Sequence, residues 1–296
     1  MTGGSTPDHL ERGATLPGRR VRARNLFRDA ANRIHDDAVA RQHGYAGALV
    51  AGVTIYGYLS QLAVAAWGPD WLRRGTSTVR FLRPVYDGEE LTLHGCVLAR
   101  SANATAGETV AELHARGSGG QSSATATAGL AWGGPVFAPN PCAYPATALP
   151  ASPPPATAEV LTSIVPLGTP VLVLDETLLA RPAEDLDDPS PIYRGSEGVA
   201  HPGLLLRQAN RALAENVALG PWIHVSSDVA HCDLARAGDR LETRGRVARV
   251  YERHGRGWVE LALLIVANGA RPIARIHHTA IYRMSVPKPA KEGRDE

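Results

Sequence analysis

The sequence predicts an α+β protein built from two similar halves, each with one central helix and an antiparallel sheet. Three observations support this prediction. Apolar residues recur near helical spacing from Val53 to Ala66, which indicates an amphipathic helix. Short segments rich in alternating apolar residues, separated by turn signals, follow that helix. The pattern of the first half then returns in the second half at a constant offset of 150 residues.

The first half supplies the elements in a simple order. Residues 19–27 predict a first strand, and the central helix is expected to end at the Gly68-Pro69 breaker. Residues 76–100 read as two strands around a Pro84-Val85 turn and a turn-forming Asp-Gly pair. Residues 109–117 and 123–132 complete a meander of antiparallel strands.

A proline-rich segment divides the chain near its middle. Eight prolines lie between Gly133 and Pro155. Such a run cannot pair inside a sheet, and it predicts an extended linker. We therefore expect an N-terminal domain over residues 1–132, a linker over 133–160 and a C-terminal domain over 161–296.

The second half matches the first at several anchors. Residues 238–241 correspond to 88–91, His201-Pro202 corresponds to Ala51-Gly52, and 280–282 correspond to 130–132. A second helix is therefore expected near 203–217, followed by further strands, and the two sheets are expected to join edge to edge. In the second half, only the residues around Tyr193 resemble the segment from Asp29 to Gly52, and the resemblance is weak. Tyr193 lies 9 residues before Pro202, whereas His35 lies 17 residues before Gly52. This difference predicts a single reaction site built on the first half, with the second half completing the sheet and the substrate tunnel.

The segment from Asp29 to Gly52 carries the residues suited to chemistry. It contains Asn32, Ile34 and His35 in the order N-x-I-H, followed by two aspartates and by Gly44-Tyr45. It then delivers the chain to the start of the predicted helix at Gly52. A helix N-terminus offers free N–H groups and the positive end of the helix dipole, which favour a developing oxyanion.

This segment resembles the signature of the MaoC-like, (R)-specific enoyl-CoA hydratase family, which reads approximately D-x-N-P-[IL]-H-x-D before a helix-opening H-G. The resemblance implies a double hotdog fold, in which each central helix is wrapped by a curved antiparallel sheet. It implies that His35 is the catalytic histidine, Asn32 the loop asparagine and Gly52 the holder of the thioester oxygen. The family's catalytic aspartate falls at Ala30 here, with Asp29 one residue earlier, and Arg33 and Ala51 replace the family's proline and histidine.

An acid/base site of this kind needs a carboxylate beside the histidine, and three aspartates are candidates. Asp29 lies nearest the family position, whereas Asp36 or Asp37 corresponds to an acid with a structural role. Asn32 either orients the water or forms a local turn. Asp37 and Tyr45 join Gly52 as candidate substrate-binding residues, and the arginines between 73 and 83 are candidates for contacting the phosphates of CoA.

Composition excludes several other classes of protein. The net charge of +2 gives little support for nucleic-acid binding, and no segment is apolar enough to span a membrane. Three distant cysteines and an N-terminus without an apolar signal core fit a cytoplasmic protein. No metal-ligand spacing, dinucleotide motif or serine-hydrolase elbow is present, so neither a metal nor a cofactor is expected.

The resemblance therefore implies a hydratase or dehydratase acting on an enoyl or 3-hydroxyacyl thioester of CoA or of an acyl-carrier protein. Two alternatives stay open: a hotdog thioesterase or cyclase that uses the same helix terminus, and a non-catalytic partner subunit that binds an acyl chain. A homodimer of double hotdogs is compatible with each of these.

Overall fold

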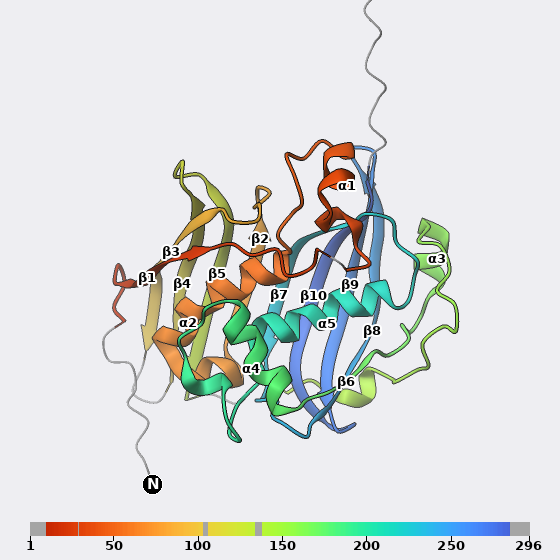
Figure 1. The fold of residues 1–296 in the computed structure, drawn as a ribbon. Helices are drawn as coiled ribbons and strands as arrows, with labels where there is room; N and C mark the ends of the chain where they lie inside the picture. Colours follow the sequence, from red (N-terminus) through yellow and green to blue (C-terminus); the bar gives the residue numbers. More distant parts are fainter. Residues whose placement is uncertain (1–9, 29, 103–105, 134–137, 285–296) are drawn as a thin grey trace, which may run out of the picture.

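The computed structural model describes residues 10–28, 30–102, 106–133 and 138–284. Its ten strands form one continuous sheet in the order β1-β3-β4-β5-β2-β7-β10-β9-β8-β6. The two long helices, α2 and α5, lie against the same face of this sheet (Figure 1). Neighbouring strands of this sheet pair antiparallel throughout. The architecture confirms the predicted double hotdog.

The first half contributes five strands and the longer helix. Its strands are β1 (Thr15–Arg22), β2 (Thr76–Phe81), β3 (Glu90–Ala102), β4 (Gly107–Gly117) and β5 (Ser122–Trp132). Its helices are the 3-10 turn η1 (Arg33–His35), α1 (Asp37–Gln42) and α2 (Gly52–Arg74). Between β1 and α2 the chain forms a loop region that includes η1 and α1, and this region lies above the start of α2 (Figure 1).

The second half repeats this plan in mirrored strand order, after the turn η2 (Pro141–Ala143) and α3 (Ala158–Ser163). Its strands are β6 (Val171–Val173), β7 (Ile223–His231), β8 (Arg240–Arg253), β9 (Arg256–Ala267) and β10 (Arg271–Arg283). Its helices are α4 (Glu176–Asp185), the 3-10 turn η3 (Pro191–Tyr193) and α5 (Pro202–Ala214). The two 3-10 turns, η1 and η3, precede α2 and α5 at corresponding places in the chain.

The two halves join along β2 and β7. These strands pair antiparallel, from Thr76 opposite Ala230 to Arg80 opposite Ser226. Because β2 also pairs with β5, and β7 with β10, neither strand is an edge of the sheet. This seam brings the start of β7 close to the start of α2, although about 170 residues separate them in the chain.

The helix α2 is buried around most of its circumference. All side chains from Val53 to Val64 are buried, because the sheet covers one side of the helix and α5 covers another. The two helices approach closely at a glycine on each: a Cβ added at Gly203 would lie 3.5 Å from the Gly57 Cα and 3.2 Å from the Val53 carbonyl oxygen. Glycine at these positions lets α5 cross the first two turns of α2.

Two predicted boundaries differ from the structure. The breaker at Gly68-Pro69 does not end α2 but kinks it, because Gly68 takes a positive φ of 60° and the helix resumes to Arg74. The last turns are retained because Trp71 and Leu72 are buried in the core. The first strand begins at Thr15 and ends at Arg22, since its pairing with β3 decides its extent.

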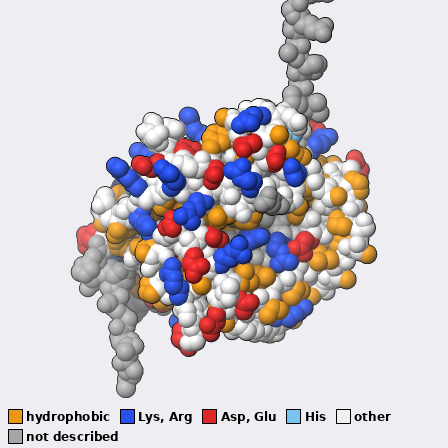
Figure 2. All heavy atoms as spheres, viewed as in Figure 1, with side chains coloured by type: hydrophobic (Ala, Val, Ile, Leu, Met, Phe, Trp, Pro, Cys, Tyr) orange, Lys and Arg blue, Asp and Glu red, His pale blue; other side chains and the backbone are white. Residues whose placement is uncertain are grey.

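The face of the molecule that carries the helices shows Lys and Arg interspersed with Asp and Glu (Figure 2). Among the helices of the described residues, none has both the length and the apolar character needed to cross a membrane.

Candidate active site

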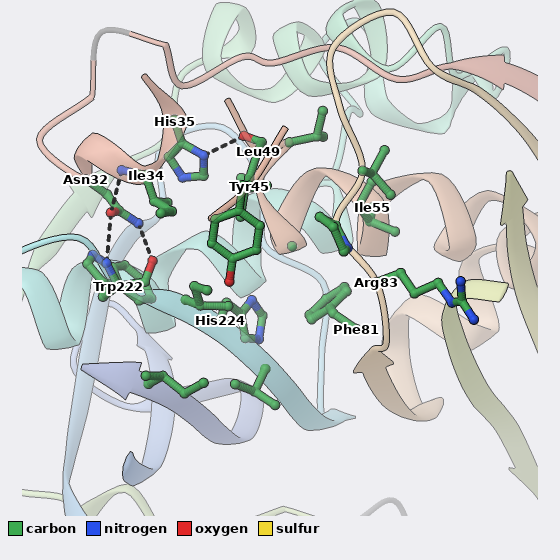
Figure 3. A pocket seen from close by; sticks show the side chains of 18 of the residues that line it. Asn32, Ile34, His35, Tyr45, Leu49, Ile55, Phe81, Arg83, Trp222 and His224 are labelled. Atoms are coloured by element: carbon green, nitrogen blue, oxygen red, sulfur yellow. Dashed lines mark hydrogen bonds between the residues drawn. The ribbon is translucent and has the colours of Figure 1, made fainter. Parts of the chain in front are cut away.

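A cavity of about 250 Å³ opens beside the first residue of α2 (Figure 3). The region between β1 and α2 forms one wall, the connection after β2 a second, and the start of β7 with parts of β9 and β10 a third. Side chains from both halves therefore line it. The residues that the argument uses are Asn32, His35, Tyr45, Gly52, Phe81, Arg83, Trp222, His224 and Arg256.

His35 ends the turn η1 and lines this cavity with only 8% of its surface exposed. Its Nδ1 lies 2.7 Å from the Leu49 carbonyl oxygen. A carbonyl can only accept, so Nδ1 carries the hydrogen and Nε2 keeps its lone pair. Nε2 has no hydrogen-bond partner among the described residues. Burial lowers the pKa of His35, and the Leu49 hydrogen bond opposes this only in part, so the ring is a neutral base.

Asn32 fastens the loop to the other half of the molecule. Its Oδ1 accepts from the Trp222 backbone N–H at 3.2 Å, and its Nδ2 donates to the Trp222 carbonyl at 3.0 Å. The same Oδ1 accepts from the Ile34 N–H at 3.3 Å and so caps η1. Both ends of the amide are therefore engaged, and Asn32 holds His35 in place over the cavity.

The three candidate aspartates have different positions. Asp36 caps α1 by accepting from the Val39 N–H at 3.1 Å. Asp37 accepts from the Ala48 N–H at 2.8 Å and pairs with Arg28 at 3.3 Å, and the Ala48 bond is the largest cause of its lowered pKa. Neither lines the cavity, and Asp29 lies outside the described residues. Among the residues that the structure describes, no carboxylate lines the cavity.

Gly52 begins α2 without a side-chain cap. The preceding residue, Ala51, offers no polar atom, and the N–H groups of Gly52 and Val53 have no partner among the described residues. A Cβ at Gly52 would lie 2.8 Å from Phe81 Cε2 and 3.0 Å from His224 Nδ1, so only glycine fits here. Gly52 lines the cavity, so its free N–H and the positive end of the helix dipole lie at the cavity.

Tyr45 and two arginines complete the polar lining. The Tyr45 side chain extends from the loop into the cavity (Figure 3), and burial raises its pKa while Arg256 opposes the rise. Of the arginines between 73 and 83, only Arg83 lines the cavity, and Arg256 from the second half adds another cation. These cations suit an anionic group at the cavity.

His224 lines the cavity from the second half, and its sequence context did not mark it. It starts no motif, and at an offset of 150 it corresponds to Arg74. Its Nε2 lies 2.8 Å from Ser227 Oγ, which lies 3.0 Å from His278 Nδ1. Its Nδ1 is buried without a partner. Only the pairing of β2 with β7 places it beside Gly52, so local sequence spacing could not have revealed it.

The corresponding region of the second half is closed. His201 caps α5, because its Nδ1 accepts from the Gly203 N–H at 3.0 Å. Its Nε2 therefore carries hydrogen and lies 3.4 Å from Asp188 Oδ2. Tyr193, which takes the place of His35, packs against His201 with the two rings tilted and their centroids 4.6 Å apart. Solvent reaches at most 2% of any of these three side chains.

Solved structures that match this fold come from proteins of related architecture. One, from Chloroflexus aurantiacus and described as a MaoC domain dehydratase, has a TM-score of 0.65 and 11% identity, and the match covers 95% of this chain and 99% of that one. A conserved protein from Mycobacterium tuberculosis, described as having a double hotdog fold, has a TM-score of 0.64 and 15% identity, with 94% and 98% covered.

A protein from Lactobacillus plantarum, described as an oleoyl thioesterase, matches with a TM-score of 0.51 and 12% identity, covering 94% of this chain and 97% of that one. No protein-family model and no curated protein sequence matches the chain. The structural likenesses show the double hotdog fold. Within the described residues, no group of three His, Cys, Asp or Glu side chains is placed to hold a metal ion.

Proposed function

We propose that this protein adds water to a 2-enoyl thioester of CoA or of an acyl-carrier protein, or removes water from the 3-hydroxyacyl thioester. The observation that carries the proposal is the meeting of a neutral, buried His35 with the uncapped start of α2 in one cavity. The solved neighbours support the same chemistry at the level of the fold, because they include proteins described as MaoC-like dehydratases.

The proposed reaction follows from these two groups. His35 Nε2 takes a proton from water as the water oxygen bonds to C3 of the substrate. The electrons of the double bond move toward the thioester oxygen, which the Gly52 N–H stabilises as an enolate. The imidazolium then returns a proton to C2 and regains its neutral form. A single ring that acts as both base and acid delivers water to one face, which gives syn addition.

Asp29 is the proposed carboxylate partner of His35. It stands one residue before the family position, and an irregular loop can absorb such a change of register. Asp36 and Asp37 are less suited to this role, because each already accepts a backbone hydrogen bond away from the cavity. A carboxylate beside the ring would stabilise the imidazolium that forms during the reaction.

Thioester hydrolysis is the second candidate, and a specific observation favours it. No carboxylate among the described residues lines the cavity, and hydrolysis at C1 needs only a base and an oxyanion site. A neighbour described as an oleoyl thioesterase shares the fold. A protein that binds the acyl thioester without turnover is the remaining alternative.

The test is incubation of the purified protein with crotonyl-CoA and with a longer enoyl-CoA. Hydration removes the enoyl absorbance without releasing thiol, and His35→Ala is expected to slow it by about a hundredfold or more. His43→Ala is the matched control, because His43 lies in the same loop region but does not line the cavity. Release of free thiol would instead assign hydrolysis, and binding without turnover would assign a non-catalytic role.

Substitution of the aspartates tests the partner. Asp29→Asn is expected to slow hydration as severely as His35→Ala, and Asp37→Asn is expected to have a milder effect. The double change Asp29→Ala with Ala30→Asp restores the family spacing and is expected to keep appreciable activity. Full activity in Asp29→Asn would remove Asp29 from the mechanism.

A further inference from the structure

The cavity contains a second buried imidazole that the proposed reaction does not use. His224 is 7% exposed, lies in β7 and belongs to the half of the molecule opposite His35. Its ring is fixed on several sides: Phe81 meets it edge-on with centroids 4.7 Å apart, and the His278 ring lies 4.2 Å away. A rigid ring at the seam of the two halves therefore forms part of the cavity wall (Figure 3).

The unpartnered Nδ1 of His224 faces the start of α2. A Cβ added at Gly52 would lie 3.0 Å from this atom, so Nδ1 sits beside the residue whose N–H is proposed to hold the thioester oxygen. Nδ1 has no hydrogen-bond partner among the described residues. A buried polar atom without a partner is costly, and a ligand that supplies the missing partner would relieve this cost.

The other side of the ring is held by a hydrogen-bonded chain. His224 Nε2 contacts Ser227 Oγ at 2.8 Å, and Ser227 Oγ contacts His278 Nδ1 at 3.0 Å. The chain can run in two directions. If it starts at His278, then Nδ1 of His278 donates to Ser227, Ser227 donates to Nε2 of His224, and Nδ1 of His224 carries a hydrogen beside Gly52.

The opposite direction is less favourable. It would leave a hydrogen on Nε2 of His278, which is fully buried and has no acceptor among the described residues. A buried N–H without an acceptor is rarer in proteins than an acceptor left unfilled. The direction that starts at His278 instead places the unpaired N–H at the cavity, where a ligand can accept from it.

We propose that His224 donates a hydrogen bond through Nδ1–H to the carbonyl oxygen of the bound thioester, beside the Gly52 N–H. Ser227 and His278 act as positioning residues that keep the ring in the required tautomer. The inference rests on the proposed function, because it assigns the second oxyanion donor of the same site. It also gives the second half a direct part in the reaction.

A neutral ring suits this role. Burial lowers the pKa of His224 well below its ordinary value, and the His278 ring lowers it further. Burial also lowers the pKa of His278 to about 3. Neutral imidazole can donate a hydrogen bond to a substrate carbonyl, as the neutral catalytic histidine of triosephosphate isomerase does. It stabilises developing charge without delivering its own proton.

The test measures the substrate carbonyl directly. Crotonyl-CoA labelled with ¹³C at the carbonyl, and its saturated analogue butyryl-CoA, are bound to the protein, and the C=O stretching frequency is recorded by isotope-edited infrared difference spectroscopy. Two donors are expected to lower the frequency on binding to the wild type. His224→Leu is expected to remove part of this shift and to reduce kcat by about a hundredfold to a thousandfold, the scale of losing one oxyanion donor.

Two further variants sharpen the result. His224→Asn keeps an N–H donor near the position of Nδ1 and is expected to restore part of the frequency shift. His231→Leu is the matched control, because it removes another buried histidine from the same strand that does not line the cavity, and it is expected to change neither readout. An unchanged frequency in folded His224→Leu would overturn the proposal.

The tautomer is tested without any substitution. ¹⁵N spectra of protein labelled in its histidines distinguish a protonated Nδ1 from a protonated Nε2, and His224 is expected to carry its hydrogen on Nδ1. Hydrogen on Nε2 would overturn the proposal even if every variant failed to fold. If neither CoA thioester binds the wild type, the proposed function is contradicted. If the thioesters bind and only the His224 results differ from expectation, the role of His224 alone is contradicted.

Discussion

At the start of α2 two amides are unpaired, and Gly52 and His35 line the same cavity. At the start of α5 the His201 ring fills the corresponding space, accepts from the Gly203 N–H and contacts Asp188. In both regions a 3-10 turn precedes the start of the helix, and the strands of each half follow the same plan. Two side chains account for the difference: His201 closes one helix terminus, and the lack of a polar side chain at Ala51 opens the other.

The same arrangement of backbone elements can therefore hold a capped helix start that stabilises the fold, or an uncapped helix start that is open to a ligand. A capped helix end with a buried polar pair stabilises the fold. An uncapped end is available to a ligand, and the molecule tolerates it because the surrounding loop and strands hold it rigidly. The second half would then support the site of the first by supplying a wall rather than a site of its own.

The largest expected difference between the halves is their response to acid. His224, His231 and His278 are buried in the second half, and burial lowers the pKa of each. A lowered pKa means that the unfolded chain binds protons which the folded protein does not, so stability is complete above about pH 6.5 and is lost as pH falls. For His231, with its pKa lowered to about 4, the loss between those values is about 3 kcal/mol.

His231→Leu isolates this contribution. Urea unfolding between pH 7 and pH 4 is expected to show a loss of stability about 3 kcal/mol smaller in the variant than in the wild type. For the wild type and for the variant, the loss is measured from that protein's own stability at pH 7. The same loss of stability in both proteins would show that folding does not lower the pKa of His231.

The next effect concerns the closed helix start. His201→Leu removes the cap of α5 and the ring that lies 3.4 Å from the buried Asp188 Oδ2, so the free energy of unfolding is expected to fall by about 2 kcal/mol. Activity toward crotonyl-CoA is expected to stay within about twofold at temperatures where the variant is folded, since His201 does not line the cavity. In an Asp188→Asn background the same change should cost less, and additive losses would argue against coupling of the pair.

A pair of glycine substitutions compares the two helix starts directly. Gly52→Ala places a methyl group against Phe81 and His224 Nδ1, and activity is expected to fall by about a hundredfold. Gly203→Ala crowds the His201 ring and the Val53 carbonyl, both at 3.2 Å, so it is expected to lower Tm with little change in kcat. Equal loss of activity in both variants would remove the functional distinction between the helix starts.

The smallest expected effect is at Tyr193. Its hydroxyl is buried and has no hydrogen-bond partner among the described residues. Tyr193→Phe removes this unsatisfied group and keeps the ring contact with His201, so stability is expected to stay equal or to rise by less than about 1 kcal/mol. Thermal unfolding measures this, and a clear loss would point to an interaction of the hydroxyl with water.

Local patterns predicted much of this fold. The offset of 150 residues predicted helices near 52–66 and 203–217, and the structure starts them at Gly52 and Pro202. It could not predict the continuation of α2 beyond Gly68, because burial of Trp71 outweighs the local breaker. The structure brings His35 and Gly52 to one cavity. Local sequence patterns offered no reason to place Trp222 and His224 in this cavity, because only strand pairing across the seam brings them there.

The two bonds between the Asn32 amide and the Trp222 backbone have a consequence for how ligand binding and folding are linked. These bonds join the loop of the first half to the second half beside the cavity. A molecule bound in the cavity therefore contacts both halves of the protein. Its binding free energy adds to the free energy that keeps the halves associated. A saturating ligand would thus protect both halves of the sheet against opening, and the protein would respond to its ligand as one thermodynamic unit.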